Sequence, residues 1–292
     1  MRTCGYIAVD WLWIVAAAWF SLAYPGPLAY LLSLVVIGAR QHAIAVHLHD
    51  GSHYLLFQNR YVNDVVARLF MEWPLFASLD SYRALHRGHH RYLNSELDPD
   101  WSRNQPYRLD EDDGLLRRLW LLSGLQVFSQ TFSALFLGLP QAETGSVGRH
   151  RVRFSFFLPW RLAFYTALAA LFYSYDSLAL IFWYWLLPYL CYFLPVMRYR
   201  GLSEHWAVPS ETMESKARTV LVGPVEAFFF YPKHINFHVE HHCFPAVPFY
   251  RLPKLHRQLM QDVRYRQRIH LCRGVGAVVR ELLGLEKKSG IS

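Results

Sequence analysis

The stretch YIAVDWLWIVAAAWFSLAYPGPLAYLLSLVVIGARQHAIAV, residues 6–46, contains two long apolar runs separated by a short turn. Crossing about 30 Å of hydrocarbon as a helix takes roughly 20 residues, and the runs Tyr6–Tyr24 and Pro27–Val46 have that length. The turn between them, residues 21–27, carries no charge. The stretch therefore predicts two transmembrane helices that form a hairpin.

A second pair of apolar runs, Phe154–Tyr175 and Ser177–Met197, predicts another transmembrane hairpin, whose turn carries only Asp176 as a charge. Lys and Arg residues lie beyond the opposite ends of the four runs, which places those ends and both termini in the cytoplasm by the positive-inside rule. We expect the polar residues near the ends of the runs to snorkel toward the interface; they are Asp10, Arg40 and Arg161.

The predicted fold class is therefore all-α: an integral, multi-pass membrane protein with four transmembrane helices in two hairpins and a cytoplasmic helical cap. The cap would consist of residues 47–153 and 198–292, and the whole chain, 1–292, would form a single domain. Two further apolar runs, Val65–Leu79 and Leu115–Leu139, contain or border charged residues, and we expect them to be interfacial or half-buried helices. A cleaved secretory signal is the alternative for the first run, but Asp10 inside it and the span that follows at once argue against it.

Composition excludes several functional classes. The 53% hydrophobic content is too high for a disordered chain and unusual for a soluble one. The net charge of +8 comes without a nucleic-acid-binding motif, so we expect no nucleic-acid partner. The 4 cysteines form no CxxC pair, which argues against a disulfide framework or a thiolate metal site. Any bound metal must use other ligands.

Histidines supply those ligands, since 15 of them occur and eight fall into three strings with helical spacing. Residues three or four apart share one face of a helix, so each string is expected to aim its imidazoles at one point. Eight imidazoles exceed the three or four of a mononuclear zinc site, and two metal ions are the simplest count. An even number of predicted spans separates the strings, so all can meet in the cap. The strings are His49-Asp-Gly-Ser-His53, His86-Arg-Gly-His89-His90 and His238-Val-Glu-His241-His242.

His205, just after the last span, is a ninth candidate ligand because it lies on the cap side between the second and third strings. Metal-bound histidines normally donate their second ring N–H to a carboxylate or carbonyl. Five acidic residues stand beside the strings for this role: Asp50, Asp98, Asp100, Glu204 and Glu240. Four other histidines lie among basic residues and are expected at the surface: His150, His234, His256 and His270.

These strings and their flanks resemble the membrane fatty acid desaturase and hydroxylase superfamily, with three histidine boxes around a non-haem diiron centre, and bacterial-type fatty acid desaturases in particular. The resemblance covers about residues 40–260, and the last box, NFHVEHHCFPAVPFYRLP at residues 236–253, is the closest part. Animal-type acyl-CoA desaturases add an Asn ligand four residues before the histidine that matches His205. Here that position is Gly201, so a water molecule is the alternative to a tenth protein ligand.

The resemblance implies O2-dependent introduction of a double bond into a long acyl chain carried by a lipid or thioester. An unactivated C–H bond has no acidic proton and no electrophilic atom, so a redox cofactor, two iron ions, must carry the chemistry. No haem or iron–sulfur motif occurs in the chain, so the electrons would come from a separate ferredoxin or a cytochrome b5-like protein. An acidic donor or an anionic membrane surface would suit the basic residues Arg251, Lys254, Arg257, Arg264, Arg266 and Arg268.

Two alternatives stay open. The first is an enzyme of the same superfamily with another product, such as a hydroxylase or a carotenoid ketolase, because ligand spacing does not show which product forms. The second is a non-enzymatic metal-binding or metal-transport membrane protein, which would place its ligands along a pathway within the spans.

Overall fold

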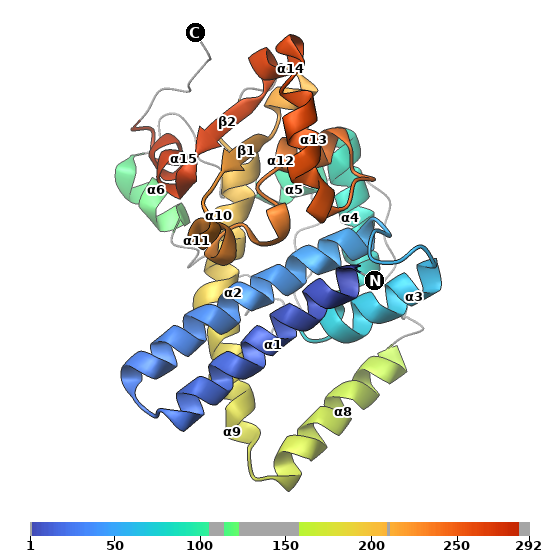
Figure 1. The fold of residues 1–292 in the computed structure, drawn as a ribbon, viewed down its shortest axis with the longest axis vertical. Helices are drawn as coiled ribbons and strands as arrows, with labels where there is room; N and C mark the ends of the chain where they lie inside the picture. The colour runs from blue at the N-terminus through green and yellow to red at the C-terminus, as the bar shows by residue number, and fades with distance from the viewer. Residues whose placement is uncertain (1, 105–113, 123–157, 209–210, 286–292) are drawn as a thin grey trace.

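The computed structural model describes residues 2–104, 114–122, 158–208 and 211–285 (Figure 1). Long helices form one end of the molecule, and shorter helices with one small sheet form a cap at the other end. The long helices are α1 (Arg2–Ala23), α2 (Pro27–Ser52), α8 (Leu158–Ser174) and a segment comprising α9 (Leu178–Ile181), two π-helical turns (Phe182–Leu186 and Tyr189–Phe193) and α10 (Leu194–His205).

The cap begins with the part of the chain that follows α2. This part contains α3 (Arg60–Ala67), a π-helical turn (Arg68–Glu72), α4 (Leu79–Tyr92), α5 (Pro99–Asn104) and α6 (Leu115–Leu122). The part after α10 contains α11 (Pro224–Phe229), α12 (His238–Cys243), α13 (Leu252–Leu259), α14 (Val263–Arg268) and α15 (Gly274–Leu282). It also contains strands β1 (Arg218–Leu221) and β2 (His270–Arg273) and three 3-10 turns at Met213–Ser215, Pro232–His234 and Phe249–Arg251.

Three helical segments within the described residues are long and apolar enough to cross a membrane: Arg2–Ala23, Pro27–Ser52 and Leu178–His205. Their outer faces carry exposed large apolar side chains such as Leu12, Trp19 and Leu28. Contiguous apolar surface of this kind is unusual on a soluble monomer. The structure thus fits a membrane protein with three of the predicted spans.

The fourth predicted span corresponds to α8, which has 17 residues and rises about 26 Å. This is shorter than the hydrocarbon core, and residues 154–157 of the predicted run lie outside the described part of the chain. Figure 1 shows the α1–α2 turn and the α8–α9 turn at the end of the molecule away from the cap. A fourth span and the sidedness of the membrane stay predictions.

The charged residues of the first hairpin do not snorkel, contrary to the prediction. Asp10 is fully buried, and its carboxylate lies 3.1 Å from Nη1 of Arg40, 2.9 Å from Nε2 of His47 and 2.8 Å from Nζ of Lys233. A charge inside an apolar helix is stable only when it is paired, and here the partners come from α2 and from the turn before α12. The ion pairs thereby join the first hairpin to the third histidine string.

The helix that ends in α10 packs closely on α2. A Cβ added at Gly38 of α2 would lie 2.6 Å from the Cβ of Tyr192, so the two helices reach this separation only because position 38 has no side chain. The side-chain amide of Gln41 donates to the carbonyl of Trp185 across the same contact. This packing fixes the direction in which both helices enter the cap.

The cap contains a two-stranded parallel sheet, so the all-α prediction is wrong in this small part of a mostly helical chain. β1 pairs with β2 in the register Arg218 to His270 through Leu221 to Arg273. An isolated antiparallel bridge joins Thr219 of β1 to Phe237, directly before α12. The sheet therefore connects the third histidine string to the C-terminal part of the cap.

The two other apolar runs do not form spans in the described residues. Residues 65–79 form the end of α3, a π-helical turn and an irregular segment with Met71 and Leu75 buried against α2, as a half-buried element should be. Leu115–Leu122 forms α6, which packs against α10, and Arg118 of α6 donates to the carbonyl of Leu282 in α15. The remainder of the run to Leu139 lies outside the described residues.

Candidate metal centre

The first histidine string is located where α2 enters the cap. His49 lies in the last turn of α2, and His53 is the residue that caps this helix. Every residue from Val46 to Ser52 is buried, so the helix end lies inside the cap rather than at its surface. Asn63 fixes the end by donating from its side chain to the carbonyl of Gly51 at 2.9 Å.

The second string lies on α4, which is capped by Ser78, whose hydroxyl accepts from the backbone N–H of Ser81. Arg83 ties this helix to the end of α2, because its guanidinium donates to the carbonyls of Gly51 and Ser52. The imidazoles of both strings consequently face one another.

The third string forms α12, and His205 is the last residue of α10. α12 has only six residues, but five of them are buried, including all three histidines of the string. Helices from four distant parts of the chain therefore deliver the nine predicted imidazoles to one region of the cap.

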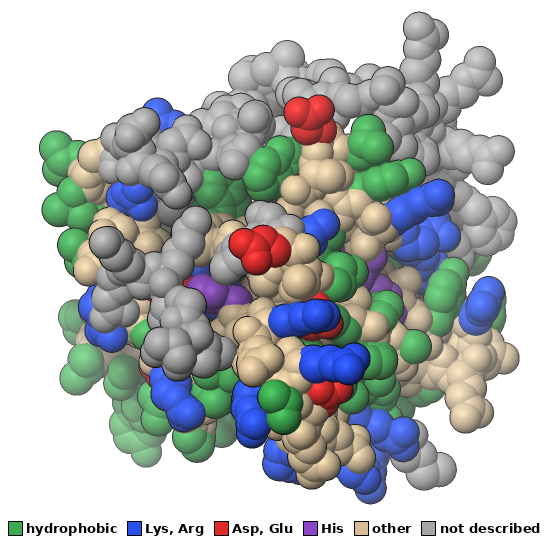
Figure 2. Space-filling model, turned by 90° about the horizontal axis from the view of Figure 1, so that it is seen from above, with side chains coloured by type: hydrophobic (Ala, Val, Ile, Leu, Met, Phe, Trp, Pro, Cys, Tyr) green, Lys and Arg blue, Asp and Glu red, His purple; other side chains and the backbone are tan. Residues whose placement is uncertain are grey.

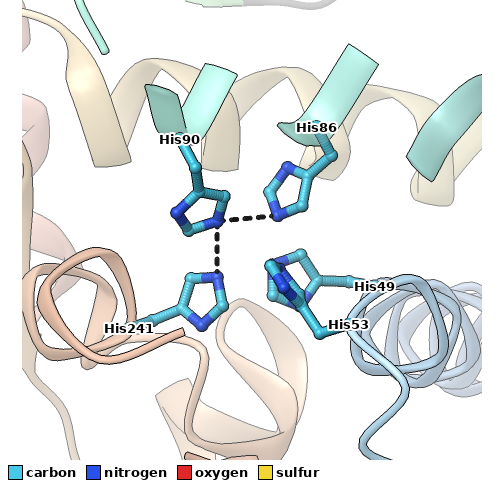
Figure 3. A group of neighbouring side chains, drawn as sticks. All are labelled: His49, His53, His86, His90 and His241. Atoms are coloured by element: carbon cyan, nitrogen blue, oxygen red, sulfur yellow. Dashed lines mark hydrogen bonds between the residues drawn. The ribbon is translucent and has the colours of Figure 1, made fainter. Parts of the chain in front are cut away.

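The nine histidines form two groups, and within each group the candidate ligand atoms all lie within 4.8 Å of one another. Group one contains His49, His53, His86, His90 and His241 (Figure 3). Group two contains His89, His205, His238 and His242. The groups adjoin, since the rings of His90 and His242 have centroids 4.4 Å apart. Each triple string is divided between the groups, which differs from the expectation that one string aims at one point.

The nitrogen atoms in each group are spaced as ligands of one ion would be. In group one, Nε2 of His90 lies 3.0 Å from that of His86 and 3.1 Å from that of His241. In group two, Nε2 of His238 lies 2.9 Å from that of His205 and 3.1 Å from that of His242. Two nitrogens each about 2.1 Å from one metal ion lie roughly 3 Å apart when they are adjacent ligands.

Hydrogen bonding among the histidines alone does not satisfy these atoms. A neutral imidazole carries one N–H, so three Nε2 atoms that face one another cannot all be paired. Nε2 of His49 and Nε2 of His53 are buried without any hydrogen-bond partner. A buried polar atom without a partner costs about 1–3 kcal/mol. A cation bound among the facing lone pairs would remove this cost, so the residues fit a metal ion in each group.

Protonation also favours metal binding. Burial lowers the pKa of His53 to about 4 and that of His90 to about 3. Burial likewise lowers the pKa values of His86, His241 and His242 well below their usual range. These five imidazoles are therefore neutral at pH 7 and have a free lone pair, which is the form that binds a metal.

Asp98 orients His89 of group two. Both carboxylate oxygens of Asp98 lie 3.0 Å from Nδ1 of His89, which leaves Nε2 directed at the group. Asp98 is held in turn by the backbone N–H groups of Asn94 and Asp100. Asp100 is a second, more distant partner at 3.8 Å. Both carboxylates thus lie near the same ring nitrogen of His89.

Asp50 and Glu204 are buried beside one histidine each. An oxygen of Asp50 lies 3.4 Å from Nδ1 of His49, and its other oxygen accepts from the backbone N–H of Phe249. Glu204 lies 3.6 Å from Nδ1 of His238, beyond a direct hydrogen bond, and pairs with Arg200 at 3.3 Å. Asp50 can hold its imidazole in the orientation that a metal ion requires, whereas Glu204 makes no direct hydrogen bond to His238.

Glu240, predicted to orient a ligand, contacts a different set of residues. Its carboxylate accepts from the hydroxyls of Thr219 and Tyr265 and pairs with Nδ1 of His256. Glu240 therefore faces away from both groups and attaches α12 to the surrounding cap. The sequence of the string does not indicate these contacts of Glu240, because all three partners are distant in sequence.

Two histidines expected at the surface are buried, which corrects that prediction. His256 pairs with Glu240, and His270 lies 3.0 Å from Glu281. Their basic sequence neighbours are exposed, but strand and helix periodicity turns the two imidazoles inward. His234 is exposed, as expected from the sequence, and His150 lies outside the described residues. A Cβ added at Gly201 would meet nothing within 4 Å, so no neighbouring side chain fills the space there.

The six predicted basic residues of the C-terminal part of the cap, Arg251 to Arg268, are all exposed. Figure 2 shows the cap from above, with many Lys and Arg side chains on this face and histidine side chains visible between them. His53, His90 and His205 are the group members that keep partial exposure. These three side chains therefore remain partly accessible from outside the cap.

Comparison with known proteins agrees with this geometry. Residues 25–272 match the sequence model of the family described as fatty acid desaturase. Dihydrorhizobitoxine desaturase of Bradyrhizobium elkanii is 28% identical over 277 residues, covering 89% of this chain and 76% of the relative. An sn-1 oleoyl-lipid 12-desaturase of Picosynechococcus is 26% identical (73% of this chain, 64% of the relative), and one of Arthrospira platensis is 25% identical (84% and 70%). Since the match spans most of the chain and includes every histidine of both groups, the protein belongs to the fatty acid desaturase family.

Proposed function

We propose that this protein is an integral membrane acyl desaturase that uses nine histidines to hold two iron ions and introduces a double bond into a long acyl chain. The observation that carries the proposal is the division of nine imidazoles from four segments into two adjoining groups whose lone pairs face inward. Iron is the metal proposed because imidazole suits it and because a C–H bond must be oxidised.

The overall reaction needs a separate electron donor. Reduction of O2 to two water molecules takes four electrons and four protons. Removal of two hydrogen atoms from neighbouring carbons supplies two of each, so a donor must supply two electrons and the solvent two protons. We propose a ferredoxin or a cytochrome b5-like protein in this role, docked on the exposed basic residues of the cap.

Bound iron would activate O2, and the residues of the chain would hold and orient it. The imidazoles of both groups would bind the metal through unprotonated nitrogens, while Asp98 and Asp50 fix the ring orientations of His89 and His49. Burial of six of the nine imidazoles would limit the access of bulk water to the site. The position and angle of the acyl carbon relative to the site would then decide where the double bond forms.

The location of the site suits a lipid substrate. α2 and α10, which belong to two of the three candidate spans, both end in group members, namely His49 and His205. The groups would therefore lie at the membrane surface, which we propose to be cytoplasmic on the strength of the positive charges around the cap. Within the candidate spans, the members of these groups lie only in the last turns, at His49 and His205, whereas a transporter would need ligands along a pathway through the spans.

The names of the relatives do not choose the substrate, since they include dihydrorhizobitoxine and an oleoyl lipid. Expression in a host with a defined fatty acid profile tests the proposal. We expect a new double bond in cellular acyl chains, about two irons per purified chain, and loss of the product in His89→Ala. Arg87→Ala, an exposed substitution on the same helix, is the matched control and should keep activity. An oxygenated product would favour a hydroxylase, and activity in His89→Ala would contradict the site.

A further inference from the structure

A third cluster of potential metal ligands lies outside the two histidine groups. His270 and Cys272 of β2 and Glu281 of α15 are all buried, and their ligand atoms lie within 4.8 Å of one another. The thiol of Cys272 is 3.0 Å from one oxygen of Glu281, and Nε2 of His270 is 3.0 Å from the other. Neither the proposed reaction nor the histidine pattern accounts for this cluster.

A guanidinium group already neutralises the cluster. Nη2 of Arg218, on the adjacent strand β1, lies 2.9 Å from the Glu281 oxygen that His270 also approaches. Arg218 is fully buried. Burial raises the pKa of Cys272 to about 12, so its thiol keeps its proton and donates to Glu281. A divalent ion at this place would meet one carboxylate, a neutral thiol and the positive charge of Arg218, so the cluster is better suited to holding the arginine.

The other hydrogen bonds of Arg218 reach the end of α10. Its Nη1 donates to the carbonyl of Ser203, and its Nη2 donates to the carbonyl of Trp206 at 3.0 Å. These carbonyls flank Glu204 and His205. The last carbonyls of a helix have no partner within the helix and carry partial negative charge, so a buried cation there stabilises the helix end.

His205 is the member of group two that this helix end presents. Its Nε2 lies 3.2 Å from that of His89 and 2.9 Å from that of His238. Its Nδ1 lies 3.4 Å from the carbonyl of Lys216, two residues before Arg218. The segment 216–218 therefore contacts both the backbone around His205 and its ring.

We propose that Arg218 is a positioning residue that caps α10 and holds His205 in group two, with His270, Cys272 and Glu281 as its anchor. Group two then depends on the C-terminal β2–α15 segment through Arg218 and α10, whereas no member of group one lies on α10. This inference rests on the proposed function only in assuming that the groups bind metal. The predicted consequence is selective: loss of Arg218 weakens one metal site and spares the other.

The test is iron titration of the purified protein in detergent. Arg218→Met removes the charge and the donors at similar volume, and we expect the affinity for the second iron to fall at least 10-fold, the scale seen when outer contacts of metal ligands are lost. The first iron should bind as in the wild type. Arg266→Met, at an exposed arginine, should bind both irons normally. Combining Arg218→Met with His53→Ala, which removes a group-one ligand, should weaken both sites.

An Arg218→Met variant that binds both irons with wild-type affinity would overturn the inference. Equal weakening of both sites in this variant would overturn it as well. If Arg218→Met does not fold, Arg218→Lys keeps the charge with fewer donors and should show a selective but smaller loss at the second iron. A wild type that binds no iron would instead contradict the proposed function.

Cys272→Ser separates this role from a third metal site. A serine hydroxyl still donates to Glu281, so we expect both irons to bind with wild-type affinity. A zinc ion present in the wild type and lost from Cys272→Ser would overturn the inference.

Discussion

Nδ1 of His89 lies 3.0 Å from both carboxylate oxygens of Asp98, nine residues further along the chain. The pair sets the tautomer of His89, because the proton on Nδ1 is donated to Asp98 and the lone pair of Nε2 faces group two. The hydrogen bonds and negative charges of Asp98 and Asp100 outweigh the opposing effect of burial and raise the pKa of His89. The increased basicity also makes His89 a stronger metal donor.

Asp98→Asn tests this relationship. The amide keeps the shape of the side chain and one acceptor oxygen but loses the charge, so we expect 10–100-fold weaker iron binding in group two. Iron titration of the purified protein measures this affinity. Asp262→Asn is a suitable control because it also replaces an acidic residue that accepts from a backbone N–H, at the start of α14. Unchanged iron affinity in Asp98→Asn would show that the carboxylate charge is not needed.

Gly88 allows Asp98 to approach His89. A Cβ at position 88 would lie 2.9 Å from Cγ of Pro99, so Gly88→Ala must move α4 or the loop that carries Asp98. We expect a destabilisation of about 1–3 kcal/mol, as for overpacking, and at least 10-fold lower activity. Thermal unfolding and product formation measure the two effects. Gly5→Ala, where the new Cβ meets nothing within 4 Å, should lower neither stability nor activity. A Gly88→Ala variant with wild-type stability and activity would contradict the close approach of position 88 to Pro99.

The ion pairs of Asp10 predict strong dependence of stability on its charge. Asp10→Asn leaves Arg40 and Lys233 buried without their carboxylate, and such a loss costs about 3–5 kcal/mol. Lys233 and His234 have φ values of 57° and 55°, so this turn is strained and depends on the pair to hold it. Thermal unfolding should show a much lower midpoint for Asp10→Asn.

Two variants make that measurement decisive. Asp176→Asn, in the exposed α8–α9 turn, changes the same charge at a position with a φ of 50°, which Asn tolerates, and should unfold like the wild type. Adding Lys233→Met to Asp10→Asn removes one unpaired charge and should recover part of the loss. Equal midpoints for Asp10→Asn and the wild type would refute the role of the ion pairs.

Glu281 predicts a specific dependence of stability on pH. Burial opposes its ionisation, but the hydrogen bond with His270 and the charge of Arg218 outweigh this and lower the pKa from 4.5 to about 2. A carboxyl group with a lowered pKa in the folded state stabilises the fold above its unfolded pKa, and this contribution disappears as the pH falls through the folded pKa. The contribution of Glu281 should be constant from pH 7 to 5 and decline between about 4.5 and 2.

The difference in unfolding midpoint between the wild type and Glu281→Gln isolates this contribution. Other carboxyl groups titrate in the same range, but they are shared by both proteins and cancel in the difference. We expect the wild type to be more stable at pH 7 and at pH 5, with a shrinking advantage below pH 4.5. If the stability advantage of the wild type over Glu281→Gln grew as the pH fell, the lowered pKa assigned to Glu281 would be wrong.

Long-range pairing explains where the sequence predictions were wrong. Asp10, His256 and His270 were expected near water because each looks unpaired beside its sequence neighbours. Each is instead buried with an ionic partner at least 11 residues away: Arg40 and Lys233 for Asp10, Glu240 for His256, and Glu281 for His270. Burial of a charge depends on a partner that only folding brings near.

The histidine spacing alone determined that three helical segments would each present closely spaced imidazoles, and the apolar runs alone determined the long helices that lead to them. Tertiary structure decided the division into two groups. Residues 89 and 90 are adjacent, so they point about 100° apart around α4, and one joins each group; residues 241 and 242 of α12 do the same. Which neighbour joins which group depends on how α2, α4, α10 and α12 pack, because that packing places the facing nitrogens, and no local periodicity specifies it.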